Sequence, residues 1–122
     1  MPIARVPEAV QFINYPPPLK LKTEHPQEYR ILYYDIEQAG IDIVANNEGS
    51  PQVIAANKAL QAACLKYAEY PTKANRLAMI AAAEHFISTF NTYGLSSTNP
   101  EQDKEEIALM QKAIAQAKTW TP

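Results

Sequence analysis

The stretch that decides the fold is SPQVIAANKALQAACLKYAEYPTKANRLAMIAAAEHFISTFNTYG, residues 50–94. It opens with the capping hydroxyl of Ser50 and then Pro51, whose fixed φ suits the first position of a helix. Apolar residues follow at the three- and four-residue spacing of an α-helix. They are Val53, Ala56, Leu60, Cys64 and Tyr67. The pattern predicts a helix over residues 51–70, which Pro71 ends.

The second half of this stretch predicts another helix, over residues 73–93, with Thr72 as its cap. Its apolar residues form two overlapping stripes, one containing Leu77 and one containing Met79, so we expect a wide apolar face and a deeply buried helix. Gly94 then predicts a stop in the left-handed conformation. The short connection between the two helices indicates that they run antiparallel.

A further helix is predicted downstream, over residues 100–119. Asn99 and Pro100 open it, and acidic residues fill its first turns, near the positive end of the helix dipole. With one more helix upstream, the sequence predicts an all-α, single-domain, antiparallel four-helix bundle over residues 26–122. A proline-rich extended N-terminal arm, residues 1–25, belongs to the same domain.

The upstream helix, over residues 26–46, has the weakest pattern of the four. Thr23 offers a capping hydroxyl, and Pro26 suits the first turn. Gly40 interrupts the apolar spacing and costs about 1 kcal/mol relative to alanine inside a helix. We therefore expect the helix to kink at Gly40, or to stop and restart there.

The arm holds six of the ten prolines, if Pro26 is counted with it. The run Pro16-Pro17-Pro18 favours extended polyproline II geometry, because each proline restricts both itself and its predecessor. Two interpretations stay open. The arm is either a strap laid along the bundle or a proline-rich ligand of the kind that docks in aromatic grooves. In the second interpretation Tyr15 and Pro17 are interaction residues.

Composition limits the classes of function. The 122 residues carry a net charge of −2, with 47% apolar and 20% charged side chains, which is typical of a globular protein without the basic surface that nucleic acid requires. No apolar run approaches the roughly 18 residues of a membrane span. The single cysteine excludes an intrachain disulfide. We expect a cytoplasmic protein that binds neither nucleic acid nor membrane.

No residue pattern predicts a catalytic site, a cofactor site or a metal site. Glu84 and His85 are adjacent on a helix and therefore point about 100° apart, so they cannot chelate one ion together. Cys64 lies on an apolar stripe without a histidine at helical spacing, which favours a buried small hydrophobe over a reactive thiol. A pocket between helices that uses His85, Tyr93 or Glu84 is the enzyme or ligand-carrier alternative.

The enrichment in tyrosine, seven residues, points instead to an interface. On the helix over residues 26–46, Ile31, Tyr34 and Ile41 lie off the main apolar stripe, so this helix has apolar residues on two sides. The simpler alternative places the tyrosines at the rim of the bundle, with their rings inward and hydroxyls outward. We predict a non-enzymatic adaptor, regulator or assembly factor that binds a protein partner or itself. A small immunity or inhibitor protein that neutralises a toxin or enzyme is the other binding alternative.

Overall fold

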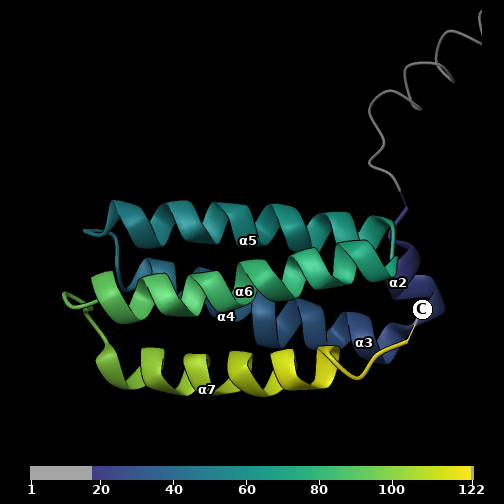
Figure 1. The fold of residues 1–122 in the computed structure, drawn as a ribbon. Helices are drawn as coiled ribbons and strands as arrows, with labels where there is room; N and C mark the ends of the chain where they lie inside the picture. Colours follow the sequence, from purple (N-terminus) through teal and green to yellow (C-terminus); the bar gives the residue numbers. More distant parts are fainter. Residues whose placement is uncertain (1–17, 122) are drawn as a thin grey trace, which may run out of the picture.

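The computed structural model describes residues 18–121, which form helices and contain no strand (Figure 1). The predicted all-α class is therefore confirmed. The helical segments are α2 (Lys20–Glu24), α3 (Pro26–Ile31), the π-helix η2 (Leu32–Glu37), α4 (Gln38–Ala45), α5 (Pro51–Glu69), α6 (Lys73–Tyr93) and α7 (Pro100–Ala117). The ends of α5, α6 and α7 lie within two residues of the spans expected from the sequence.

Side-chain caps begin each of the three long helices. The oxygens of Ser50, Thr72 and Asn99 accept a hydrogen bond from the backbone N–H three residues further on, at 3.3, 3.1 and 3.2 Å. Such a cap satisfies one of the free N–H groups of the first turn and contributes about 1 kcal/mol. The first residues of these three helices are therefore set by local hydrogen bonds that the sequence predicts.

Gly94 ends α6 for a different reason from the one predicted. Its φ is −86°, so the expected left-handed conformation is wrong. A Cβ at this position would lie 2.5 Å from the ring of Phe90 and 2.7 Å from the Phe90 carbonyl oxygen. Glycine is needed here because the chain passes too close to the preceding turn for any side chain.

The helix expected over residues 26–46 is irregular, but not at Gly40. Gly40 lies inside α4 without a break, so the helix does not stop and restart there. A Cβ on Gly40 would lie 2.6 Å from Oδ1 of Asn57, so glycine lets α4 and α5 approach closely. The irregularity lies upstream, where η2 replaces the α-helical hydrogen bonds with the wider i→i+5 pattern.

The segment before this helix is also more ordered than expected. Residues 20–24 form the short helix α2, and Leu21 within it is fully buried. The hydroxyl of Thr23 donates to the carbonyl of Leu19 at 3.4 Å, so Thr23 is not the predicted cap. His25 occupies the cap position of α3; its side chain does not accept from a backbone N–H of the helix, but its Nδ1 lies 3.0 Å from the carboxylate of Glu28 in that helix.

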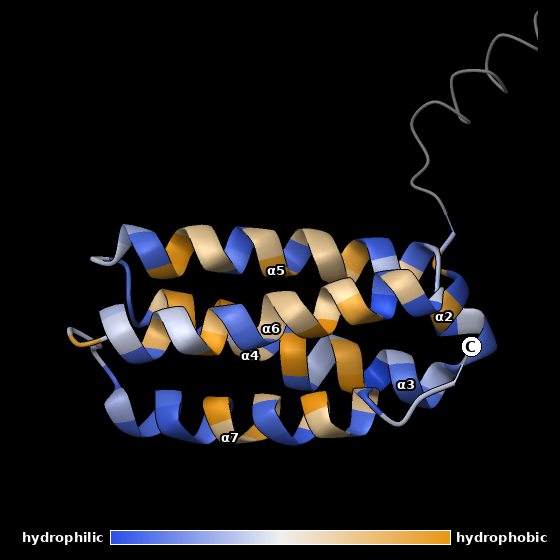
Figure 2. Ribbon diagram, in the orientation of Figure 1, coloured by the Kyte–Doolittle hydropathy of each residue, from blue (hydrophilic) through white to orange (hydrophobic). Residues whose placement is uncertain are grey.

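Contacts between the helices close into a ring around one apolar core. Helix α5 packs on α6, α6 on α7, α7 on η2 and α4, and these in turn on α5 (Figure 1). Figure 2 shows apolar residues recurring along each helix between hydrophilic ones. The largest fully buried apolar side chains are Leu21, Leu32, Ile36, Ile43, Leu60, Tyr67, Met79, Phe86 and Met110. The stripe predicted on α5 is buried as expected, whereas Leu77 on α6 is 52% exposed and does not belong to the core. Among residues 18–121, no helix has both the length and the apolar character needed to cross a bilayer.

A buried carboxylate joins the two turns at one end of the molecule. Asp103, in the first turn of α7, is only 1% exposed. Its oxygens accept hydrogen bonds from the side-chain amides of Asn46 and Asn47, both at 2.9 Å, and from the hydroxyl of Ser97 at 2.5 Å. We call these four residues the Asp103 network. Hydrogen bonds to a charged acceptor are among the stronger ones, so the network fixes the end of α4 against the start of α7.

Candidate interaction surface

The structure describes three of the five predicted interaction residues, and they differ in exposure. Ile31 ends α3 and packs half-buried against the core, whereas Tyr34 in η2 is 60% exposed. Ile41, on α4, is 38% exposed. Tyr15 and Pro17 lie outside the described residues.

Three tyrosine rings form a continuous contact along the outside of α3 and η2. The rings of Tyr29 and Tyr33 meet edge to face, with centroids 6.0 Å apart. The rings of Tyr33 and Tyr34 are stacked, with centroids 4.9 Å apart and planes inclined by 12°. The ammonium of Lys22, from α2, lies 5.8 Å from the centre of the Tyr29 ring. We call Tyr29, Tyr33 and Tyr34 the tyrosine ladder.

The stacked pair of rings lies within the π turn. On a regular α-helix, neighbouring residues point about 100° apart and their side chains do not face each other. Tyr33 and Tyr34 are neighbours and nevertheless stack, and both lie within η2. Single π turns inside α-helices occur frequently at functional sites. The local irregularity therefore coincides with the most exposed aromatic residue of this segment.

A groove of about 410 Å³ lies beside the outermost ring of the ladder. Its walls are Gln27, Arg30, Ile31, Tyr34 and Asp35. Ile31 and Tyr34, two of the predicted interaction residues, therefore line one groove, whereas Ile41 does not line it. The lining offers one apolar residue, one aromatic ring, a guanidinium, an amide and a carboxylate.

Burial tunes the ionisable groups around the ladder. It raises the pKa of Tyr29, with further contributions from the carboxylate of Glu37 and from Tyr33 and Tyr34. Burial also raises the pKa of Glu37 at the end of η2. The raised pKa of Tyr29 favours its protonated hydroxyl, which can donate a hydrogen bond, and the raised pKa of Glu37 makes the ionised carboxylate less favourable in the folded chain.

The other chemically interesting residues do not converge on one site. His85 and Tyr93 line a shallow groove of about 330 Å³ between α5 and α6. The carboxylate of Glu84 instead pairs with the ammonium of Lys118, directly after α7, at 3.1 Å. Of the three residues named for a pocket between helices, His85 and Tyr93 therefore share one groove, and Glu84 lies on another face of α6.

Cys64 lies in the core, 1% exposed, and burial raises the pKa of its thiol well above the ordinary value, with a smaller contribution from Glu37. A thiol in this state is a poor nucleophile at neutral pH. Within residues 18–121 there is no group of three or more His, Cys, Asp or Glu side chains that could hold a metal ion.

Sequence reasoning missed two features that depend on tertiary packing. Arg76, in the first turns of α6, is 5% exposed, and its Nη1 has no hydrogen-bond partner among the described residues. It lies close to Tyr67. Burial raises the pKa of the Tyr67 hydroxyl, and a hydrogen bond with Arg76 offsets part of this rise. The second feature is an open groove between α6 and α7, with a volume of about 530 Å³. Neither feature could be predicted from the sequence, because a single arginine in a helical pattern and a gap between two helices do not change the periodicity of the apolar residues.

No protein-family model, no curated protein and no solved structure matches this chain.

Proposed function

We propose that this chain is a non-enzymatic protein–protein interaction protein, an adaptor, regulator or assembly factor, that presents the outer face of α3, η2 and α4. The observation that carries the proposal is the tyrosine ladder. Tyr34 is 60% exposed, yet its ring is held in place by stacking on Tyr33. A large aromatic side chain that is both accessible and fixed is costly to leave in water and well suited to bind a partner.

The rigidity of Tyr34 supports binding more directly than its exposure does. Immobilising a flexible side chain costs about 0.5–1.5 kcal/mol on association. The stack on Tyr33 removes part of this cost before any partner arrives. Interface hot spots are enriched in such tyrosines, and Ile31 lies in the same groove as an apolar contact.

We also propose that the helices form an antiparallel four-helix bundle, with the proline-rich segment as an N-terminal arm. The ring of contacts among α5, α6, α7 and the α3–η2–α4 segment supports this arrangement. So do the short turns between successive helices, which favour antiparallel neighbours. In such a bundle the ladder lies on an outer face, where a protein partner or a second copy can reach it.

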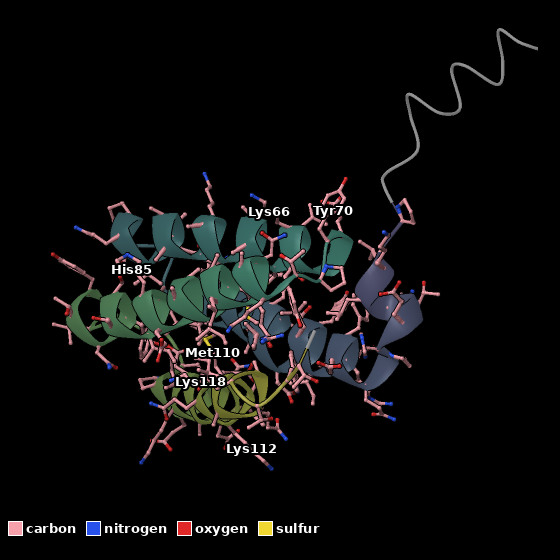
Figure 3. All side chains as sticks on the ribbon, turned by 45° about the vertical axis from the view of Figure 1, so that its right-hand side comes forward. Lys66, Tyr70, His85, Met110, Lys112 and Lys118 are labelled. Atoms are coloured by element: carbon pink, nitrogen blue, oxygen red, sulfur yellow. The ribbon has the colours of Figure 1, made fainter. Side chains whose placement is uncertain are left out.

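The test combines solution mass with capture of partners from the native cell, for the wild type and for Tyr34→Glu. We expect the substitution to abolish self-association or partner capture, because it places a charge at the centre of the contact. Tyr70→Glu is the matched control. Tyr70 is 54% exposed and points outward from the end of α5 (Figure 3). If both variants behave as the wild type does, the proposal is wrong.

A second candidate, a small-ligand carrier, is favoured by the groove between α6 and α7. Its lining contains the apolar Ile87 and Ile114, uncharged polar groups such as Asn91 and Gln111, and the ion pair of Glu84 with Lys118. A volume of about 530 Å³ falls within the range of small-molecule sites. Replacing Ala115 by Trp would fill this groove. Retained thermal stabilisation by a ligand after that change would exclude the groove as its site.

A further inference from the structure

The groove beside Tyr34 is rich in hydrogen-bond donors. The guanidinium of Arg30, the amide of Gln27 and the hydroxyl of Tyr34 can all donate, whereas Asp35 contributes the only carboxylate. Within residues 18–121, neither Arg30 nor Asp35 takes part in a salt bridge. The guanidinium of Arg30 is therefore free to donate to a ligand that presents acceptors.

A proline-rich segment is such a ligand. In polyproline II geometry the backbone makes no internal hydrogen bonds, so every carbonyl oxygen is available to a donor. Proline has no N–H, so a run of prolines presents acceptors without matching donors. The flat pyrrolidine rings pack on exposed aromatic faces, which is how other proline-rich segments are recognised. The groove matches this chemistry with one outward aromatic ring and three donor groups.

We propose that the Tyr34 groove binds a proline-rich segment in polyproline II geometry, and that this segment is residues 15–18 of a second copy of the chain. The proposal rests on the proposed function, because it names the partner of the tyrosine ladder. The sequence Tyr15-Pro16-Pro17-Pro18 supplies three consecutive prolines and an additional ring that can stack on Tyr34. Each copy then carries both a ligand and a groove.

The attachment of the ligand favours a second copy over the same molecule. Residues 15–17 directly precede Pro18, the first described residue, so they reach no further than about 14 Å from Leu19 of their own chain. The ligand is attached to a fixed point, because Leu21 is fully buried and Leu19 packs against the core. Consecutive prolines resist reversing direction, so a run leaving this anchor is suited to bridging to a neighbour.

Mutual exchange of this kind also gives a closed assembly. When each copy inserts its proline segment into the groove of the other, both contacts are identical and the pair has two-fold symmetry. Two weak contacts in one closed dimer reinforce each other through effective concentration. The expected assembly is a dimer whose stability depends on both Tyr34 and the prolines.

The first experiment titrates a fluorescently labelled peptide of residues 10–18 with the full chain and follows fluorescence anisotropy. We expect saturable binding that Tyr34→Ala weakens by at least about tenfold, the effect of removing one hot-spot contact. Tyr70→Ala, an exposed tyrosine at the end of α5, should leave the affinity unchanged. A peptide with Pro16, Pro17 and Pro18 replaced by alanine should bind at least about tenfold more weakly. Equal affinity for both peptides, or for both tyrosine variants, overturns the proposal.

The second experiment measures the solution mass of the full chain with Pro16 and Pro17 both replaced by alanine. We expect this variant to shift from dimer to monomer, as Tyr34→Glu should. If Tyr34→Glu dissociates the dimer and the proline variant does not, the tyrosine ladder is an interface but the proline segment is not its ligand. That result overturns this proposal and leaves the proposed function standing. If Tyr34→Glu changes neither mass nor partner capture, the proposed function itself fails.

Discussion

The α5–α6 pair and the α3–η2–α4 segment face each other across the same core, but different rules form them. In α5–α6, side-chain caps, proline at a first helical position and a regular apolar stripe agree with one another. In α3–η2–α4, the first cap position lacks a side-chain hydrogen bond, the hydrogen-bond pattern widens at η2, and a buried glycine allows close contact with α5. The first region is organised by local signals and the second by its neighbours.

This difference indicates where function is most easily accommodated. A region whose local and tertiary preferences agree has little reason to deviate from ideal geometry. The tyrosine ladder lies in the region where the geometry deviates. In the same segment Tyr33 stacks on Tyr34, and Tyr34 is accessible.

The largest expected effect tests the regular region. Phe86 on α6 is fully buried, so Phe86→Ala should lower the free energy of unfolding by about 3–5 kcal/mol through lost burial and a cavity. Urea denaturation measures the change. Leu77→Ala on the same helix is the control, and it should cost less than about 1 kcal/mol because Leu77 is half exposed. A similar loss in both variants would mean that α6 packs differently from the structure described.

The next effect tests the connection between the two regions. Asp103→Ala leaves three buried or half-buried donors without their carboxylate, and we expect a loss of about 2–3 kcal/mol. Thermal unfolding measures it. Glu105→Ala, an exposed neighbour on α7, should change stability by no more than about 0.5 kcal/mol. Equal stability of the two variants would show that the Asp103 network does not hold the turns together.

A smaller effect tests the contact between Gly40 and α5. In most helices Gly→Ala is stabilising by about 1 kcal/mol. Here the new Cβ would lie 2.6 Å from Oδ1 of Asn57 and 3.4 Å from the Leu60 side chain, so we expect Gly40→Ala to be destabilising by about 1 kcal/mol instead. The combination with Asn57→Ala should remove the clash. A stabilising single substitution would contradict the close approach of the two helices.

The smallest effect concerns Glu37, at the end of η2. Burial raises the pKa of this carboxyl above its ordinary value of 4.5, so the ionised group is less favourable in the folded state. Glu37→Gln should therefore be stabilising by a few tenths of a kcal/mol, about the size of a surface effect, at pH 7. The gain should disappear as the pH falls below 4.5, where the carboxyl is protonated in both states. A gain that persists at pH 3.5, or a loss at pH 7, would be evidence against this assignment; Glu48→Gln on the exposed turn is the control.

The sequence predicts the parts of this fold that depend on near neighbours. Ser50, Thr72 and Asn99 cap their helices as expected, because a cap involves only residues three positions apart. The π turn could not be predicted, since its apolar spacing is compatible with an ordinary helix. From the sequence, Gly40 is expected to be a weak point of its own helix. Its contact with Asn57 could not be predicted, because Asn57 lies on another helix, α5.

The candidate surface was predicted only in part. Its apolar composition is visible in the sequence, so Ile31 and Tyr34 could be named as a contact. The stacking of Tyr33 on Tyr34 depends on the hydrogen-bond pattern of the backbone, which residue types do not specify. The Asp103 network could not be predicted from the sequence either, because its donors are as many as 57 positions away from Asp103 along the chain.

The π turn also has an evolutionary consequence. An i→i+5 turn encloses one residue more than the α-turn it replaces, so η2 is the structural equivalent of a single-residue insertion. A related chain without that residue would keep both flanking helices in register with the core, while its alignment with this one would need a gap of one position within residues 32–37.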